Sequence, residues 1–499
     1  MYNAINSKTL RRAGEFKLTD VTLVSYQQGI DEKPKRVDIK SQVLELNIYE
    51  SIFAKGLVGS IVIFDAQNIP NHLPLTGFEQ LELVFGTPGT SRVYDFSAET
   101  GHPMHIYKIS DRKGANPRSQ MYVLHFCSKE VMFNEQIKIE NTYTDTIDNM
   151  VTAIFKDQLD SKKTLFVEST KNIRKYIIPK MRPFQAIEML ANEAESARFN
   201  NAGMYFYETA MGYHLRSLEN MLAITDQVAR PVVARYEFKP KGTKAGTGKS
   251  NILYEMQNAS DFTILSQFDS LKNVRNGVYN SKNIFHDAFN KTFGEFDFDY
   301  HTQYDKNFHT EHDGSGSKQD NKSMLPLYRY QPNKFFSDFA NTNINMFSET
   351  SKIHTGIEYP EYTKLISKRL SQRLAFTSMK LGLTVPGFTG LSVGDLVAFE
   401  MPAYEPPGID NPLDHDPYMS GRYLVATIRH KISTATDNHT MNIELMKDSV
   451  RVAYPEETND LLSTRQNQDD LLVKQYDLDD AIVEQNNETD GNSDVFTDA

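Results

Sequence analysis

The sequence predicts a mainly β protein with α+β insertions, in which two antiparallel β-barrel domains flank a small α/β module. Two stretches, near residues 44–126 and 379–446, alternate apolar and polar residues and are interrupted by Gly and Pro. A period of two is typical of strands that bury one face. Between them, near residues 147–194, apolar residues recur at helical spacing. At 499 residues the chain is long enough for about three domains.

The first block is expected to form a β-barrel domain over residues 1–140. Its clearest strand places Leu44, Leu46 and Ile48 on one face, separated by polar residues. Five similar runs follow and make an antiparallel sheet or barrel the expected structure. The predicted strands cover residues 44–48, 59–64, 81–85, 93–96, 105–109 and 121–126.

The central part, residues 141–262, is predicted to be an α/β module with a hairpin. Apolar residues at i, i+3, i+4, i+7 and i+8 spacing predict a helix from Ile147 to Phe155. A second helix is predicted to begin at Pro183, because proline is favoured in the first turn of a helix. Aromatic runs on both sides of Gly212 predict the hairpin.

The second β-barrel domain is expected over residues 263–455, with a polar insertion at about residues 297–350. Residues 264–290 are predicted to contain a short helix, with Ile264 among its apolar positions, and then a strand. A longer helix is predicted near residues 362–370. The strands of this barrel are predicted at residues 379–385, 397–401, 423–428 and 441–445.

Four short sequence motifs occur in an order and at a spacing typical of one protein family. They are VLELNIYESIF at residues 43–53, LPLTG at 73–77, LTVPG at 383–387 and LSVGD at 391–395. Together with the two β-blocks, they resemble the baseplate hub proteins of contractile-tailed phages and, more distantly, the spike bases of type VI secretion systems. The resemblance extends over about residues 15–450 and includes no catalytic signature.

The resemblance implies tail-tube-like barrels and a structural virion protein, not an enzyme. Such a hub forms a homotrimeric ring with pseudo-six-fold symmetry, joins the six-fold tail tube to the three-fold central spike, and lets the genome pass. The implied partners are other copies of the chain, the spike protein, tail tube or tube-initiator proteins, baseplate wedge proteins and transiently passing DNA. The implied location is the tail baseplate of the virion, after assembly in the host cytoplasm. The alternative is a hub of a phage-tail-like contractile injection particle or of a type VI secretion particle.

The negative charge of the chain is concentrated at its C-terminus. Residues 456–499 contain 13 Asp or Glu and two basic residues, Arg465 and Lys474, which gives −11, the same as the whole chain. Residues 1–455 are therefore formally neutral. Nucleic-acid-binding proteins normally carry a basic excess that neutralises phosphates, so this balance argues against a dedicated nucleic-acid binder.

The acidic tail, residues 456–499, allows two interpretations. Its composition is typical of a disordered, solubilising segment. It also contains apolar clusters about ten residues apart, which favour a segment that becomes ordered on a partner or neighbouring subunit. These candidate partner-binding residues are Leu461, Leu462, Leu471, Leu472, Val473, Ile482 and Val483.

Cys127 is the only cysteine, so the chain forms no internal disulfide and no multi-cysteine metal site. It ends a predicted strand, where a small buried apolar residue is expected rather than a nucleophile. Folding in a reducing cytoplasm is expected. No apolar run approaches the length of a membrane-spanning helix, and the N-terminus lacks the apolar core of a secretory signal.

No catalytic, cofactor or metal site is expected. Residues 246–250, GTGKS, resemble the end of a phosphate-binding loop, but Thr243 occupies the position where that motif requires glycine. A hairpin loop followed by a strand at residues 251–256 is expected instead, and a nucleotide-binding enzyme is the disfavoured alternative. A group of possible ligands in the polar insertion is expected to be solvated, because its spacing fits no known metal site. That group consists of His301, Asp305, His309, Glu311, His312 and Asp313.

Overall fold

The computed structural model divides the chain into two units, residues 1–451 and 452–499, and all residues described below belong to the first. The acidic tail and residues 246–250 lie outside the described part. Among the described helices, none is long and apolar enough to cross a membrane. The described residues are 10–26, 33–73, 75–199, 203–225, 228–238, 252–287, 291–304, 306–311, 322–325, 329–331, 334–335, 344–348, 361–403 and 415–451.

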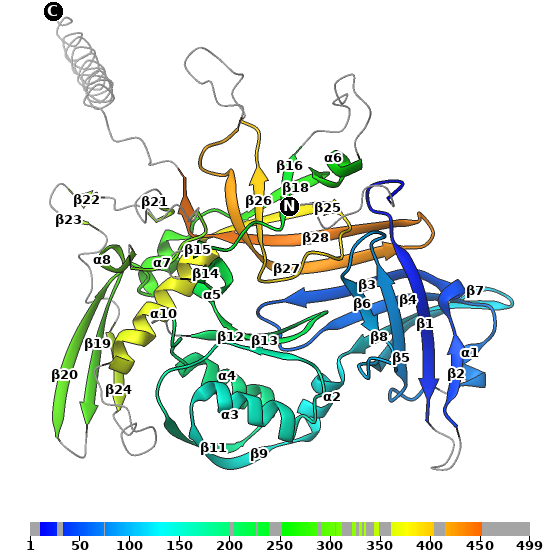
Figure 1. Cartoon of the computed structure of the whole chain (residues 1–499), viewed down its shortest axis with the longest axis horizontal. Helices are drawn as coiled ribbons and strands as arrows, with labels where there is room; N and C mark the ends of the chain where they lie inside the picture. The colour runs from blue at the N-terminus through cyan, green and yellow to red at the C-terminus, as the bar shows by residue number, and fades with distance from the viewer. Residues whose placement is uncertain are drawn as a thin grey trace, which may run out of the picture. The chain divides into compact units, whose positions relative to one another are not determined.

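All six strands predicted for the N-terminal block are present (Figure 1). Two more, β1 and β2, precede them in the chain. The second half of β1 is buried at successive positions, so it lacks the alternation by which the others were predicted. The elements of this block are β1 (Lys17–Ser25), β2 (Lys35–Asp38), a 3₁₀ turn (Lys40–Gln42), β3 (Val43–Ser51), β4 (Val58–Asp65), α1 (Ile69–His72), β5 (Gln80–Gly86), β6 (Val93–Phe96), β7 (Met104–Asn116) and β8 (Ser119–Cys127).

These strands form an antiparallel sheet in the order β3-β4-β8-β7-β5-β1-β2, and β6 pairs with β5. One face of each strand enters a common apolar core. In β4, for example, Ile61 and Ile63 are fully buried while Ser60 and Val62 are half-buried. The sheet therefore has one apolar and one more polar face, as the alternation predicts.

The second block closes into a ring of strands. Ser260 alone separates β17 from β18; β17 pairs with β16, and β18 pairs with β25. The strand order β18-β25-β28-β27-β26-β16-β17 thus returns to its starting point around a core of its own. The four predicted strands, β25 to β28, are present, whereas β16, β17 and β18 were not predicted as part of this barrel. The strands are β16 (Ala234–Phe238), β17 (Asn258–Ala259), β18 (Asp261–Ser266), β25 (Met379–Pro386), β26 (Leu396–Glu400), β27 (Gly421–Ser433) and β28 (Asn438–Lys447).

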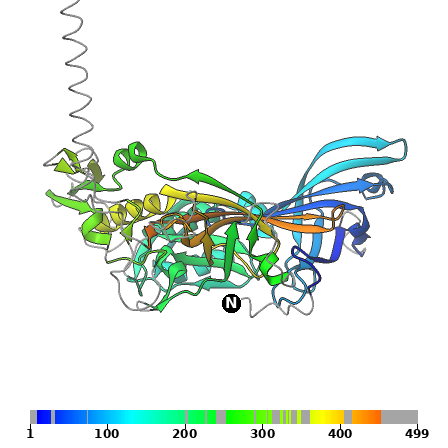
Figure 2. The same cartoon turned by 90° about the horizontal axis from the view of Figure 1, so that it is seen from above.

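The two blocks share a strand. The first part of β27, residues 421–424, pairs with β26, and after an irregularity its second part, residues 427–433, pairs with β3. The irregularity redirects the strand, so the same edge of β27 pairs first with β26 of the second block and then with β3 of the first block. Figure 2 shows β27 and β28 (orange) running into the blue strands of the first block. Fifteen strands consequently belong to one continuous sheet.

The α/β module has the two predicted helices and the predicted hairpin. The first helix, α3, continues into a π-helical turn, and its apolar face packs with that of α4 against β12 and β13. The elements of this region are α2 (Lys129–Gln136), β9 (Ile139–Asp145), α3 (Ile147–Ala153), the π turn (Ile154–Gln158), β10 (Leu165–Val167), β11 (Arg174–Met181), α4 (Pro183–Glu193), β12 (Met204–Thr209), β13 (Gly212–Ser217), α5 (Leu218–Leu222), β14 (Ala223–Thr225) and β15 (Val228–Ala229).

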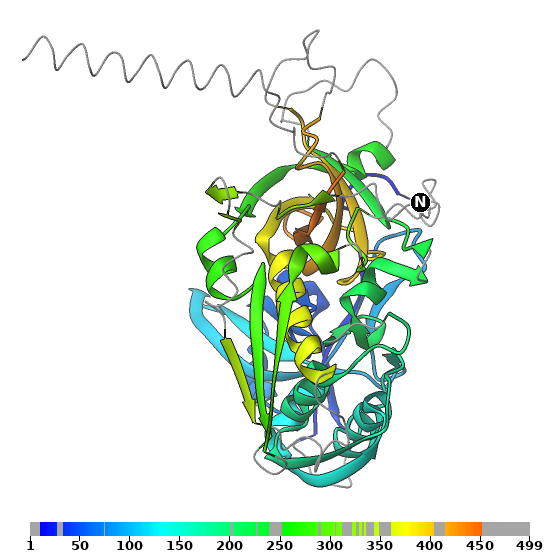
Figure 3. The same ribbon diagram turned by 90° about the vertical axis from the view of Figure 1, so that its left-hand side faces the viewer.

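The remaining elements lie between β17 and β25 or beside them. Helix α10, predicted near residues 362–370, packs along β19 and β20 (Figure 3). These elements are α6 (Ile252–Met256), α7 (Ser270–Arg275), β19 (Asn280–Asp287), β20 (Thr292–Asp299), α8 (Tyr300–Tyr304), β21 (Lys322–Ser323), β22 (Arg329–Gln331), β23 (Lys334–Phe335), β24 (Ile344–Ser348), α10 (Glu361–Ser378) and β29 (Ser449–Val450).

Two local predictions in this region were wrong. Ile264 was assigned to a helix, but it lies in β18 opposite Leu381, since pairing with the barrel outweighs local helical spacing. Residues 251–256 were expected to form a strand, but residues 252–256 form the short helix α6. The expected lack of a helix after residues 246–250 was one argument against a phosphate-binding loop there, and α6 removes it. The remaining argument is Thr243, which stands where the motif requires glycine.

Candidate functional site

The polar face of the shared sheet contains a groove of about 540 Å³. It crosses five strands, β18, β25, β28, β27 and β3. On β28, Asn442 and Glu444 are exposed, whereas Met441, Ile443 and Leu445 alternate with them and are buried in the core. The groove therefore lies on the sheet face opposite the apolar core. We call this surface the polar sheet face; its groove residues include Tyr49, Ser51, Asp261, Thr263, Thr384, Thr427, Arg429, Asn442 and Glu444.

The cations of this face at the junction of β27 and β3 have partners. The guanidinium of Arg429 donates to the side-chain oxygen of Asn47 over 3.0 and 2.9 Å and lies 5.7 Å from the ring centre of Tyr49. Lys431 forms an ion pair with Glu45 at 3.3 Å. Glu45 also lies 3.9 Å from Arg429, so one carboxylate offsets part of these two positive charges.

A buried carboxylate joins three parts of the chain on the other side of the sheet. Tyr94 donates a hydrogen bond to Glu50 over 2.6 Å, and the backbone N–H groups of Ala210 and Val393 donate to the same carboxylate over 3.3 and 3.4 Å. Glu50 belongs to β3, Ala210 to the hairpin turn of the module, and Val393 to the loop before β26. Burial raises the pKa of Glu50 to about 7, against the lowering effect of the bond from Tyr94.

Two buried histidines extend this contact. Nε2 of His430 lies 2.8 Å from the Tyr94 hydroxyl, and Nδ1 of His430 lies 3.1 Å from Nε2 of His439. Burial lowers the pKa of both histidines, so they are neutral near pH 7. When Glu50 is ionised, Tyr94 must donate to it and accept from His430, and His430 then accepts from His439. One ordered chain of hydrogen bonds thus connects β3, β6, β27 and β28.

A second buried cluster fixes the module to the first block. The ammonium of Lys163 lies 2.8 Å from Glu130 and 2.5 Å from Glu208, and all three side chains are almost fully buried. Glu208 also accepts from the backbone N–H of Leu57 over 2.7 Å, and Ser128 donates to it. Removing one member of such a cluster leaves a buried charge without compensation, so these contacts hold the two parts in one geometry.

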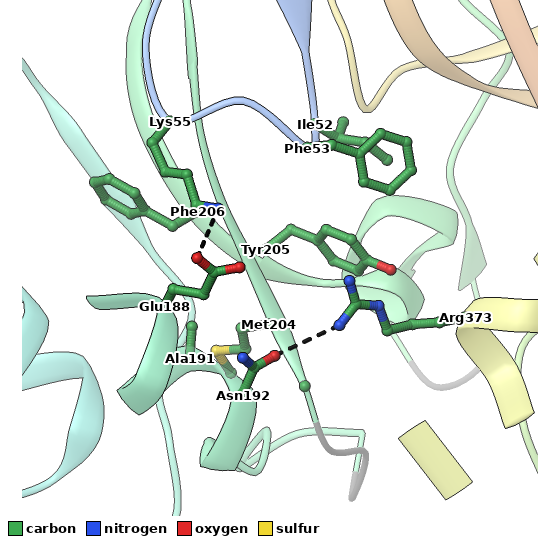
Figure 4. Close-up of a pocket in the computed structure, with 11 residues that line it drawn as sticks. Ile52, Phe53, Lys55, Glu188, Ala191, Asn192, Met204, Tyr205, Phe206 and Arg373 are labelled. Atoms are coloured by element: carbon green, nitrogen blue, oxygen red, sulfur yellow. Dashed lines mark hydrogen bonds and ion pairs between the residues drawn. The ribbon is translucent and has the colours of Figure 1, made fainter. Parts of the chain in front are cut away.

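A small cavity of about 90 Å³ lies where the loop after β3 meets α4, β12 and α10 (Figure 4). Lys55 and Glu188 form an ion pair at 2.9 Å across it, and Arg373 donates to Asn192 over 3.5 Å. The guanidinium of Arg373 also lies 5.4 Å from the ring centre of Tyr205. Because these charged side chains bind each other or an aromatic face, the cavity is best understood as a joint between elements.

The expectation that the histidine cluster of the polar insertion is solvated was wrong for His309 and Glu311, which are buried. Nδ1 of His309 lies 2.8 Å from Asp448; burial alone would lower the pKa of His309, but this carboxylate raises it above its ordinary value. Glu311 accepts from Arg451 over 2.9 Å. These residues fasten the insertion to the end of the second block because they bond to the chain that follows β28.

The other predicted residues have mixed outcomes. Cys127 is buried as expected, and burial raises the pKa of its thiol to about 12. Asp305, His312 and Asp313 lie outside the described residues, as do all apolar clusters of the acidic tail. Within the described part of the chain, no group of three or more His, Cys, Asp or Glu side chains could hold a metal ion.

The fold is that of a mainly β protein in which buried polar contacts fasten two β-blocks and an α/β module to one another. The chain is similar to the probable baseplate hub protein of Vibrio phage KVP40, with 22% identity over 430 residues that cover 82% of this chain and 91% of that protein. This similarity confirms the resemblance to phage baseplate hub proteins. No protein-family model matches the chain.

Solved structures of phage-tail and secretion proteins are also similar. A tail protein from Neisseria meningitidis MC58 matches with a TM-score of 0.46 and 11% identity, covering 87% of this chain and 97% of that protein. The E. coli c3393 protein, a component of the type VI secretion system, matches with a TM-score of 0.39 and 8% identity, covering 89% and 79%. TM-scores below 0.5 do not by themselves establish a common fold.

Proposed function

We propose that the chain is a structural virion protein, a baseplate hub whose three copies form a ring with pseudo-six-fold symmetry. The observation that carries this proposal is the continuous sheet, in which one chain places two β-blocks with separate apolar cores side by side. The first block is antiparallel, and the second is antiparallel except at β16, which pairs parallel with β17 and β26. Three chains would supply six such blocks and would still be three-fold related. The similarity to the KVP40 protein supports the same assignment.

In this proposal the parts of the chain have different tasks. The domains at residues 1–140 and 263–455, the second completed by β16 and β17, form the ring and contact the tail tube or its initiator proteins. The module at residues 141–262 braces the ring, and the tail at residues 456–499 binds a partner through its apolar clusters. The buried Lys163 cluster and the Glu50 contact support a rigid arrangement, because they fasten the module to both blocks.

The ring would surround a channel through which the genome passes, with the polar sheet face as its wall. Two features support this role. Arg429 and Lys431 are engaged by neighbouring side chains, and Asp261 and Glu444 add negative charge to the groove. A wall without free excess cations would not retain the phosphates of passing DNA.

The opposite side of the ring would bind the three-fold central spike, and wedge proteins would surround the assembled hub in the tail baseplate. In this role the chain is not an enzyme and needs no cofactor. Its ionisable clusters are consistent with a structural part, since each described cluster joins separate segments of the chain through buried contacts. Assembly would take place in the host cytoplasm before the tail is completed.

Light scattering on the purified full-length protein tests the proposed oligomer. We expect a mass of about three times 57.0 kDa that persists over a dilution series. Negative-stain electron microscopy of the same sample should show rings with six peripheral densities and overall three-fold symmetry. A monomer or dimer at every concentration, in the presence as well as the absence of the spike protein, would contradict the trimeric hub.

A further inference from the structure

An exposed apolar surface lies where β18 ends and α7 begins. Four large apolar side chains within eight residues are exposed there: Ile264 by 38%, Leu265 by 50%, Phe268 by 70% and Leu271 by 81%. Leu265 also lines the groove of the polar sheet face, so this surface adjoins the groove. We call these four residues the α7 patch. Clustered exposure of this kind marks an interaction site more often than a solvated surface.

The α7 patch is held in place by the barrel. Ser266 donates to the backbone oxygen of Ser378 over 3.1 Å, and the buried side chain of Asn273 donates to the Ser378 hydroxyl over 3.2 Å. Asp269 accepts from the backbone N–H of Lys272 over 2.9 Å and so caps α7. The apolar side chains consequently project from an anchored segment, and a partner would find them preorganised.

Positive charge surrounds this patch. Lys272 and Arg275 are exposed on α7, and Lys380 lies on β25 opposite Ser266. The ion pairs found among the described residues include none of these three cations. The carboxylate of Asp269, which caps α7, leaves a net positive charge among these groups. The chemistry that fits the surface is therefore an acidic segment with aliphatic side chains.

The chain itself contains one segment with this chemistry. Residues 456–499 contain 13 acidic and two basic residues, and their apolar clusters consist of Leu, Val and Ile. The last described residue is Arg451, and at about 3.3 Å per extended residue the first cluster, Leu461 and Leu462, could lie up to about 33 Å from it. A reach of that size allows the segment to extend to a binding site on another subunit.

We propose that the α7 patch of one copy binds the acidic segment, residues 456–499, of a neighbouring copy. The aliphatic clusters of the segment cover Phe268 and Leu271, and its carboxylates face Lys272, Arg275 and Lys380. This interaction rests on the proposed assembly of several copies, and it gives the acidic tail the task of linking adjacent subunits. Its electrostatic part weakens with salt, whereas its apolar part does not.

Site-specific photo-cross-linking in the full-length protein tests the inference. One copy contains p-benzoylphenylalanine in place of Phe268 together with Asp470→Glu, a change that adds one methylene to its own tail and so marks it by mass. It is co-expressed with an unmodified copy. After irradiation, mass spectrometry identifies which tail peptide is attached at position 268, and light scattering of the same sample reports whether the copies associate.

We expect residue 268 to be linked to tail peptides that contain Asp470, which come from the neighbouring, unmodified copy. Cross-links only to the mass-marked tail peptides, or none to the tail in a sample that is a trimer, would overturn the inference and leave the hub function standing. A monomeric sample would instead contradict the hub itself. Placing the photo-cross-linker at Phe293, which is 61% exposed on β20, provides the control position.

A pair of tail variants separates specific binding from chance proximity. Leu471→Asp with Leu472→Asp in the unmodified copy should reduce the cross-link yield at least about fivefold, because it removes aliphatic contacts from the segment. Asn486→Asp with Asn487→Asp adds the same charge outside the apolar clusters and should leave the yield unchanged. Equal loss in both variants would show that the patch does not recognise the apolar clusters.

Discussion

Glu50 joins three separate parts of this chain, and its protonation is linked to the stability of the fold. Burial raises its pKa from an ordinary value of 4.5 to about 7. The folded state therefore holds this proton more tightly than the unfolded state does. Its contribution to stability is fully present below pH 4.5 and is lost as the pH rises through 7.

Glu50→Gln should remove this pH dependence. Between pH 4.5 and 7.5 the wild-type protein should lose up to about 3 kcal/mol of unfolding free energy through this group, at about 1.4 kcal/mol per pKa unit. Gln retains an oxygen that can accept from Tyr94 but cannot ionise. Urea unfolding curves of both proteins at pH 5 and pH 7.5 measure the difference.

The matched control is Glu444→Gln, which changes an exposed carboxylate on the same sheet. It should leave the wild-type pH profile in place. If the wild-type and Glu50→Gln proteins lost stability in parallel between pH 5 and 7.5, Glu50 would not be the titrating group.

The environment of a single residue could be predicted only where its position in a predicted strand determined its burial. Cys127 was predicted to be buried because it ends an alternating strand, and the structure confirms this. Glu50 lies in an equally clear strand, but Tyr94 is 44 residues away from it, and the next member of the chain of hydrogen bonds, His430, is 336 residues beyond Tyr94. Pairing of this kind is determined by the fold and leaves no local signal. The same reason explains why His309, which binds Asp448, was expected to be solvated.

At the scale of elements, strands with an alternating pattern were predicted, and the fully buried hairpin β12–β13 was predicted from its aromatic runs around Gly212, whereas β1 and β18 had neither signal. The run from β3 to β8 and the set from β25 to β28 show the alternation and were predicted. β1 is buried at successive positions, and β18 has exposed residues at most of its positions. Closure of the second barrel by β16, β17 and β18 depends on pairing between distant segments, which local periodicity does not report.

A pair of glycine substitutions tests how tightly the sheet elements pack. A Cβ atom at Gly59 of β4 would lie 2.2 Å from the Phe126 ring and 2.5 Å from the backbone oxygen of Asn47. Gly59→Ala should therefore destabilise the protein by about 1–3 kcal/mol or more, because the sheet must separate locally. The midpoint of thermal or urea unfolding measures this loss.

Gly114→Ala in β7 is the matched control, since a Cβ atom at Gly114 would meet no other atom within 4 Å. This variant should have unchanged or slightly higher stability, because alanine restricts the unfolded chain. Similar unfolding midpoints for both variants would show that β3, β4 and β8 are not packed as described.

At the scale of the whole molecule, the distribution of charge separates two kinds of surface. Residues 1–455 are neutral in sum; Arg429 and Lys431 of the polar sheet face have partners, whereas Lys272, Arg275 and Lys380 form no ion pair with another described residue. The acidic excess belongs to the tail, residues 456–499. A surface along which DNA passes should have its positive charges paired, whereas a surface that binds an acidic segment needs positive charges that are available. The two surfaces adjoin, because Leu265 of the α7 patch also lines the groove, but the cations of α7 itself, Lys272 and Arg275, are not among the groove residues.

The last prediction follows from this separation. Asp261→Lys with Glu444→Lys would replace two negative charges in the groove by positive ones, and neither side chain forms a described ion pair that would be broken. The wild-type protein should bind a short DNA duplex weakly at about 50 mM salt. The variant should bind it at least about tenfold more tightly and should lose this gain at about 200 mM salt, because each added phosphate contact contributes to the salt dependence. Fluorescence anisotropy with a labelled duplex measures both affinities.

The comparison is decisive only with a charge-matched control elsewhere on the chain. Glu140→Lys with Asp157→Lys adds the same charge at two exposed positions, on β9 and on the π turn, outside the groove. In the proposed ring, three copies of the groove face one channel, so their added charges act on the same DNA molecule, whereas charges on the module do not converge there. Equal gains in both variants would mean that net charge alone governs DNA binding, and that the polar sheet face is not the wall of a common channel.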